Sequence, residues 1–184
     1  MNFYLLFKKH YFYIFLIPFF FIGATLSTKV GITHDELYDL NVWEANKNLF
    51  LNNFFNTDLD TSFLSGGSKF YGSGFHILSI PIESLTIFLF SDTHYLEKTK
   101  ILLSKHITVF ILFFISGLFF KRILKLIIEN EFFSNLGTVF YFLNPYLLGH
   151  SFFNVKDIPF LTFWIICTYL IIKISKVFFK EREV

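Results

Sequence analysis

The residues best suited to chemistry lie in one short run, Thr33-His34-Asp35-Glu36, which follows the first long apolar stretch. Two adjacent carboxylates repel each other, and each loses hydration if it lies near lipid. Such a pair can accept a proton from a hydroxyl group. Helix capping explains part of the same pattern, because Thr33 and Glu36 have the spacing of a capping box. Capping would occupy Glu36 and leave Asp35 available.

A second group of polar residues comes late in the chain and contains His150, Lys156 and Asp157. Asp157 stands two residues before Pro159, which is the pattern of an N-cap followed by proline in the first helical turn. A helix N-terminus also favours bound anions, so capping and a chemical role are compatible.

Between these groups, Lys69 precedes Phe70-Tyr71-Gly72 and could hold a phosphate, although an ordinary solvated lysine gives the same pattern. His34 could bind a metal together with His150 or Asp157, but no HxH or HxxxH spacing occurs. No cofactor is therefore certain, and a divalent metal is an open alternative. The sequence has no nucleotide-binding fingerprint.

The composition predicts that these residues are positioned by a membrane protein. Hydrophobic residues make up 54% of the 184 residues and charged residues only 16%, whereas soluble domains carry about 25% charged residues. The net charge of +2 and the absence of a basic stripe argue against nucleic-acid binding. The single cysteine, Cys167, cannot form an intrachain disulfide.

The apolar runs predict an all-α membrane protein with about four transmembrane helices in a single domain, 1–184. For the first apolar run, 11–28, a cleaved signal peptide is the alternative to a transmembrane helix. His106, at the start of the second run, is interpreted as an interfacial residue. The predicted spans are 11–28, 106–120, 132–149 (interrupted near Asn144-Pro145) and 158–172.

A long external loop, 29–103, should carry interfacial helices. Residues 33–50 read as a helix lying on the interface, with an apolar side formed by Leu37, Leu40, Trp43 and Phe50. A polar loop over 52–69 follows. Pro81 and Glu83 make 75–90 a juxtamembrane or re-entrant helix rather than a full span, because a carboxylate at mid-depth is expensive.

The positive charges indicate the orientation. Lys and Arg gather in 1–10, 121–131 and 173–184, whereas the short loop 150–157 contains only Lys156. This distribution predicts a multi-pass protein of the cytoplasmic (inner) membrane with both termini in the cytoplasm. The carboxylates, His34 and Lys69 would then face the external, periplasmic side.

The order of these parts resembles the N-terminal portion of the GT-C membrane glycosyltransferases. The closest resemblance is to family 39 and its RgtA/B/C/D-like relatives, the dolichyl-phosphate-mannose-protein mannosyltransferase group. The resemblance covers nearly all of the chain, but the two prolines that often follow the position of Lys69 are absent. It is carried by three stretches: His34-Asp35-Glu36-Leu37-Tyr38, 69–76, and 143–159.

This resemblance implies transfer of a sugar from a polyprenyl-phosphate donor to an acceptor hydroxyl on the non-cytoplasmic face. Asp35 would be the general base, with Glu36 as its capping neighbour, and Asp157 would orient the acceptor or a metal. Besides the donor lipid, the partners would be membrane lipids. Residues expected to bind the substrates are His34, Lys69, Tyr71, His150 and Lys156.

The resemblance also implies that the chain is incomplete as a single enzyme, because the later donor-binding spans of the family have no counterpart here. A second polypeptide could supply them. The alternatives are a non-catalytic truncated fragment and a small multi-pass membrane subunit. The absence of charge from 107–120 and 158–172 argues against a polar transport path through those spans.

Overall fold

The computed structural model describes residues 3–70, 72–89 and 96–180, with the side chains of 3–10, 69–70 and 179–180 outside the description. All regular elements in these ranges are helices, which confirms the predicted all-α class. The chain forms two compact units, one made of residues 1–29 and 106–184 and the other of residues 30–105. They are called the helical-bundle unit and the loop unit below.

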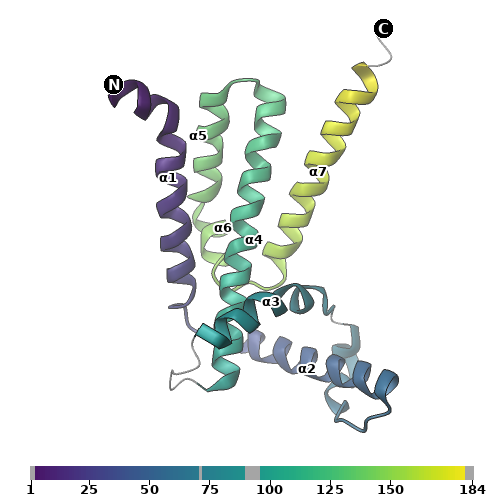
Figure 1. The fold of residues 1–184 in the computed structure, drawn as a ribbon. Coiled ribbons are helices and arrows are strands. Elements are labelled where there is room, and N and C mark those ends of the chain that lie inside the picture. The colour runs from purple at the N-terminus through teal and green to yellow at the C-terminus, as the bar shows by residue number, and fades with distance from the viewer. Residues whose placement is uncertain (1–2, 71, 90–95, 181–184) are drawn as a thin grey trace. The chain divides into compact units, whose positions relative to one another are not determined.

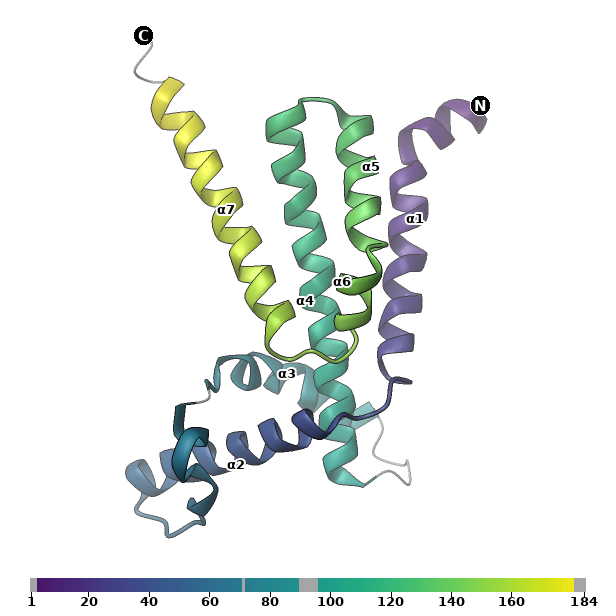
Figure 2. The same ribbon diagram turned by 180° about the vertical axis from the view of Figure 1, so that it is seen from behind.

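The helical-bundle unit contains α1 (Phe3–Ser27), the larger part of α4 (Glu97–Ile128), α5 (Glu131–Phe142), α6 (Pro145–His150) and α7 (Asp157–Lys180). The N-terminal end of α1, the α4–α5 turn and the C-terminal end of α7 lie at one end of this unit, in both views (Figures 1 and 2). The three segments predicted to be cytoplasmic therefore gather at the same end.

Aromatic side chains form the core of this unit. Phe110, Phe113 and Phe142 are completely buried, and Phe19 of α1 packs on Phe142 with ring centroids 4.9 Å apart. Two glycines permit aromatic rings to approach neighbouring helices closely. A Cβ atom added at Gly23 would lie 2.0 Å from the Phe110 ring, and one at Gly117 would lie 2.2 Å from the Phe142 ring. Glycine is therefore required where each aromatic ring meets a neighbouring helix.

Two helices in the described part of the chain are long and apolar enough to cross a bilayer, and they correspond to the predicted spans 106–120 and 158–172. The predicted span over 132–149 is not one helix. The Asn144 side chain accepts hydrogen bonds from the backbone N–H groups of Tyr146 and Leu147, so a new helix, α6, starts at Pro145. The apolar part of α1, Tyr11–Ser27, is shorter than the two candidate spans. Four spans are thus not confirmed.

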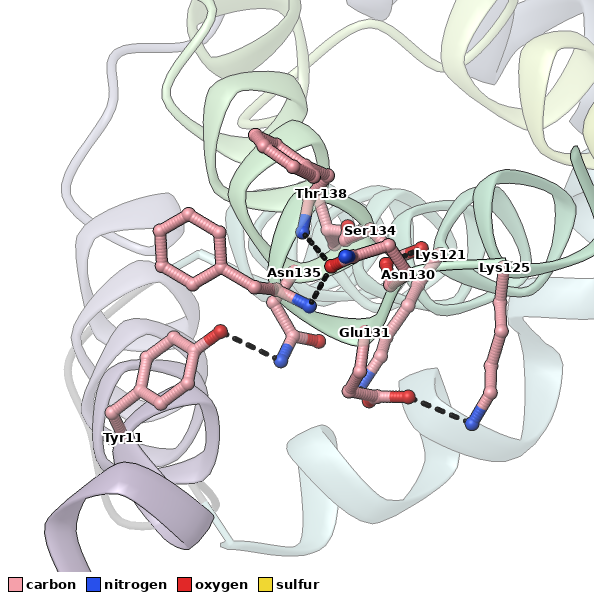
Figure 3. Close-up of polar contacts among 10 residues, drawn as sticks. Tyr11, Lys121, Lys125, Asn130, Glu131, Ser134, Asn135 and Thr138 are labelled. Carbon is pink, nitrogen blue, oxygen red and sulfur yellow. Dashed lines mark hydrogen bonds and ion pairs between the residues drawn. The ribbon is translucent and has the colours of Figure 1, made fainter. Parts of the chain in front are cut away.

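Polar contacts tie the helices together at the end predicted to be cytoplasmic (Figure 3). Asn135 donates to the hydroxyl of Tyr11 at 3.0 Å, which links α5 to α1. Glu131 forms ion pairs with Lys121 and Lys125 at 3.1 and 2.7 Å. Hydrogen bonds from Lys125 and Lys121 hold the pKa of Glu131 below its ordinary value. At the opposite end, His106 is fully buried, and its Nδ1 lies 3.1 Å from the Ser27 carbonyl oxygen.

The loop unit contains α2 (His34–Phe55), the short helices η1 (Ser62–Leu64) and η2 (Gly66–Phe70), α3 (Gly74–Leu89) and the first turns of α4. The bounds of α3 agree with the predicted helix at 75–90. α2 begins where predicted but continues to Phe55, so the predicted helix at 33–50 was too short and the predicted loop over 52–69 began too early. Part of the predicted loop is ordered by Asn52, whose Oδ1 accepts from the Leu59 N–H and whose Nδ2 donates to the Leu59 carbonyl.

Burial in α3 is inverted relative to a soluble protein. The buried residues of this helix are His76, Ser79 and Thr86, whereas Ile77, Leu85, Phe88 and other large apolar residues are exposed. Burial in α2 is mixed. Leu40, Val42 and Ala45 are buried together with Glu36 and Asp39, whereas Leu37 and Phe50 of the predicted apolar side are exposed.

Candidate functional site

The first turn of α2 places Asp35 and Glu36 in different environments. Glu36 is buried, and its Oε1 accepts a 2.9 Å hydrogen bond from the backbone N–H of Thr33, as part of a capping box. The sequence-based prediction of this cap is confirmed. His34 and Asp35 are exposed. The helix start therefore uses one carboxylate for capping and presents the other to the surroundings.

A buried ionic cluster lies deeper in the loop unit, between α3 and the start of α4. The Nζ atom of Lys105 is 3.0 Å from Nδ1 of His76 and 3.5 Å from Oε2 of Glu83. Lys105 is only 1% exposed, so its ammonium group depends on these partners for the interactions that water would otherwise provide. A carboxylate within an apolar helix is costly because it loses hydration, and at Glu83 the opposite charge of Lys105 lies beside it.

Trp43 of α2 covers this cluster. Its ring is stacked on the imidazole of His76, with centroids 5.5 Å apart and planes 9° from parallel. Because a charged Lys105 can only donate, Nδ1 of His76 must accept, and the ring proton then belongs on Nε2. The arrangement couples α2, α3 and α4 and holds the His76 imidazole between the Lys105 side chain and the Trp43 ring. It can serve as an anchor, and it also places a group able to accept a proton beside an ammonium group.

Sequence reasoning did not propose this cluster. The available signal was a pair of opposite charges, Glu83 within an apolar helix and Lys105 at the edge of an apolar run. Buried charges are usually paired, so each of them indicated a partner.

In the helical-bundle unit, Asn154 connects two of the predicted site residues. Its Nδ2 donates to Oδ2 of Asp157 at 2.9 Å and lies 2.9 Å from Nδ1 of His150. Its Oδ1 accepts from the backbone N–H groups of Lys156 and Asp157 at 3.1 and 2.8 Å. Asp157 is the first residue of α7, and the side chain that accepts the backbone N–H bonds is that of Asn154. The structure thus brings His150 and Asp157 together through a residue that the sequence analysis did not select.

The remaining candidates are not joined to these groups. Asp35 and Asp157 belong to different units, so their action at one site stays a prediction. The side chain of Lys69 and the whole of Tyr71 lie outside the described residues. Among the described residues, no group of three or more His, Cys, Asp or Glu side chains is arranged to hold a metal ion.

Comparison with known proteins identifies no relative. No family model, no curated protein and no solved structure matches this chain.

Proposed function

We propose that this chain is a membrane glycosyltransferase that transfers a sugar from a polyprenyl-phosphate donor to an acceptor hydroxyl on the non-cytoplasmic face of the inner membrane. In this proposal Asp35 is the general base, and further spans needed for donor binding come from a second polypeptide. The chain crosses the membrane four times, with α1 and the α5–α6 segment as the two additional spans and both termini in the cytoplasm.

The observation that carries the proposal is that Asp35 and Glu36 lie in different environments. A general base must reach its substrate and must not be consumed by a structural bond. Glu36 is buried in the capping box, whereas Asp35, on the same helical turn, is exposed.

The inverted burial supports a location in or at the membrane. Exposed apolar residues occur along α3, α5 and α7, and the buried positions of α5 include Ser134, Asn135 and Thr138. Monomeric soluble proteins rarely expose contiguous apolar surfaces on this scale. A lipid-linked donor keeps its chain in such an environment while its sugar phosphate reaches the interface.

The His150–Asn154–Asp157 network supports the assignment of Asp157 to orientation of the acceptor. Asn154 fixes the Asp157 carboxylate from one side and contacts His150 from the other. A carboxylate fixed in this way is preorganised, which reduces the cost of ordering it when substrate binds. Lys156 is the cation closest in sequence to this network, and we assign it, with Lys69, to the donor phosphate.

The test is sugar transfer by membranes that contain this chain and its partner polypeptide, with a radiolabelled polyprenyl-phosphate sugar as donor. Asp35→Asn should lower transfer by about 10²–10⁴-fold, the usual contribution of a general base. Asp58→Asn is the matched control, because Asp58 is an exposed carboxylate of the same unit. Membrane insertion and expression should be unchanged in both variants.

Full transfer by Asp35→Asn would disprove the catalytic assignment. If the natural chain and its partner transfer no sugar from any polyprenyl-phosphate donor, the chain is a non-catalytic membrane subunit.

A further inference from the structure

An apolar groove of about 460 Å³ runs along α1 in the helical-bundle unit. One wall is the stripe Ile14, Pro18, Ile22 and Leu26, whose members are four residues apart and so lie on one face of the helix. The other wall consists of Leu143, Leu148 and Phe152.

The groove exists because α5 is short. This helix ends at Phe142, Asn144 and Pro145 start a new helix, and the chain then turns away through α6. A continuous helix over 132–149 would have covered α1 for its whole length. The break leaves the α1 stripe covered on one side only, and Gly23, which packs on the Phe110 ring, provides the floor.

The dimensions of the groove match one acyl chain. From Ile14 to Leu26 the helix rises about 18 Å at 1.5 Å per residue, and half of a bilayer hydrocarbon core is about 15 Å. At about 30 Å³ per methylene, close to the volume of a water molecule in the liquid, the groove holds roughly 15 chain carbons. A long polyprenyl chain is several times larger.

The positive charge beside the Leu26 end of the groove indicates which kind of lipid headgroup would fit there. Lys29 follows the groove by one turn, and its backbone N–H bonds to the Leu26 carbonyl oxygen at 2.8 Å. Its side chain is exposed and forms no hydrogen bond or ion pair with any residue that the structure describes. No acidic residue occurs in 3–29 or in 143–152. A cation beside an apolar groove of one-leaflet length fits a phosphate-bearing lipid.

We propose that this groove binds one phospholipid, with an acyl chain along α1 and its anionic phosphate headgroup on Lys29. The inference is independent of the proposed sugar transfer, since no residue assigned to that reaction takes part. Its consequence is that α1 and the α5–α6 break are joined through a bound lipid rather than by direct packing alone.

The experiment uses the full chain in nanodiscs containing traces of a phosphatidylglycerol with a photoactivatable group in the middle of a C16 chain. After illumination, the labelled residues are identified by mass spectrometry. We expect labelling concentrated on Ile22, Leu26 and Leu148. Ile22→Trp should fill the groove and reduce the labelling of Leu148 to the background of other apolar surfaces.

Ile17→Trp is the matched control. Ile17 is on the same helix and has nearly the same exposure, 57% against 59% for Ile22, but it does not line the groove. This variant should keep the labelling of Leu148. Lys29→Gln should reduce the preference for phosphatidylglycerol over phosphatidylcholine by about fivefold, the effect of roughly one basic residue near an anionic headgroup.

Equal labelling on the groove and on the Ile17 face would overturn the proposal. So would displacement of the probe by a polyprenyl phosphate but not by excess phosphatidylglycerol. The Asp35 assay measures transfer and does not depend on these outcomes, so failure of one proposal can be distinguished from failure of the other.

Discussion

The buried pair of Lys105 and Glu83 offers a sharp test of how the loop unit is stabilised, because the lysine of a matched exposed pair lies on the same helix, α4. Lys98 and Glu44 are also 3.5 Å apart, but their side chains are 60% and 37% exposed. Lys105 and Glu83 are 1% and 20% exposed. The two pairs therefore share residue types, distance and the helix that carries the lysine, and they differ in burial.

The expected losses in the free energy of unfolding follow from how deeply each pair is buried. Lys105→Met keeps the length of the side chain but leaves Glu83 without its cation and His76 without its donor. Removal of one partner from a buried pair costs about 3–5 kcal/mol, and the partial exposure of Glu83 favours the lower figure, about 3 kcal/mol. Lys98→Met removes an exposed pair and should cost less than about 0.5 kcal/mol. For a unit of this size, 3 kcal/mol corresponds to a fall in Tm of more than about 10 °C.

Trp43 provides the readout, because its ring is stacked on His76 within the cluster. The chain has two tryptophans, so a Trp164→Phe background leaves Trp43 as the only one. Thermal unfolding in detergent, followed by the fluorescence of Trp43, then reports on the loop unit. The double variant Lys105→Met/Glu83→Gln removes both charges and should recover most of the loss.

Two results would refute this reasoning. Equal, small losses for Lys105→Met and Lys98→Met would mean that Lys105 is not held in a buried pair. A double variant as unstable as Lys105→Met would mean that the loss comes from packing and not from an uncompensated carboxylate.

Two further predictions concern the helical-bundle unit, and thermal unfolding of the purified chain in detergent checks both. Gly117→Ala should cost about 1–3 kcal/mol, because the new Cβ would lie 2.2 Å from the fully buried Phe142 ring. Gly149→Ala, whose Cβ would meet nothing within 4 Å, should not destabilise the unit, and an equal loss there would exclude overpacking as the cause. Glu131 has a lowered pKa, so its ion pairs stabilise the fold above the ordinary value of 4.5 and are lost as the pH falls through the lowered value. Glu131→Gln should therefore lower stability at neutral pH by well under about 1 kcal/mol, since this side chain is half exposed. The variant should also lose less stability than the natural chain as the pH falls below 4.5; an unchanged acid dependence would contradict this role.

The sequence was informative where a local pattern determines local structure. The Thr33–Glu36 spacing located the start of α2, and Asn144-Pro145 marked the place where the third predicted span is interrupted. It was uninformative where two distant segments meet. Nothing in the spacing of His76, Glu83 and Lys105 shows that they meet, because their contacts depend on how α3 and α4 pack.

The apolar side predicted for α2 shows why burial was harder to predict than helix position. Leu37, Leu40, Trp43 and Phe50 were grouped by helical spacing. Leu40 is buried, but Leu37 and Phe50 are 42% and 54% exposed, and the polar residues Glu36 and Asp39 are buried. In water, hydrophobic residues move inward, and a helical periodicity can be read directly as a core-facing stripe. Beside lipid, nothing drives apolar side chains inward, and polar groups gain by finding partners inside the protein. The inversion in α3 is therefore the pattern expected of a helix that contacts lipid, and the mixed burial in α2 is the pattern expected of a helix at the edge of the lipid.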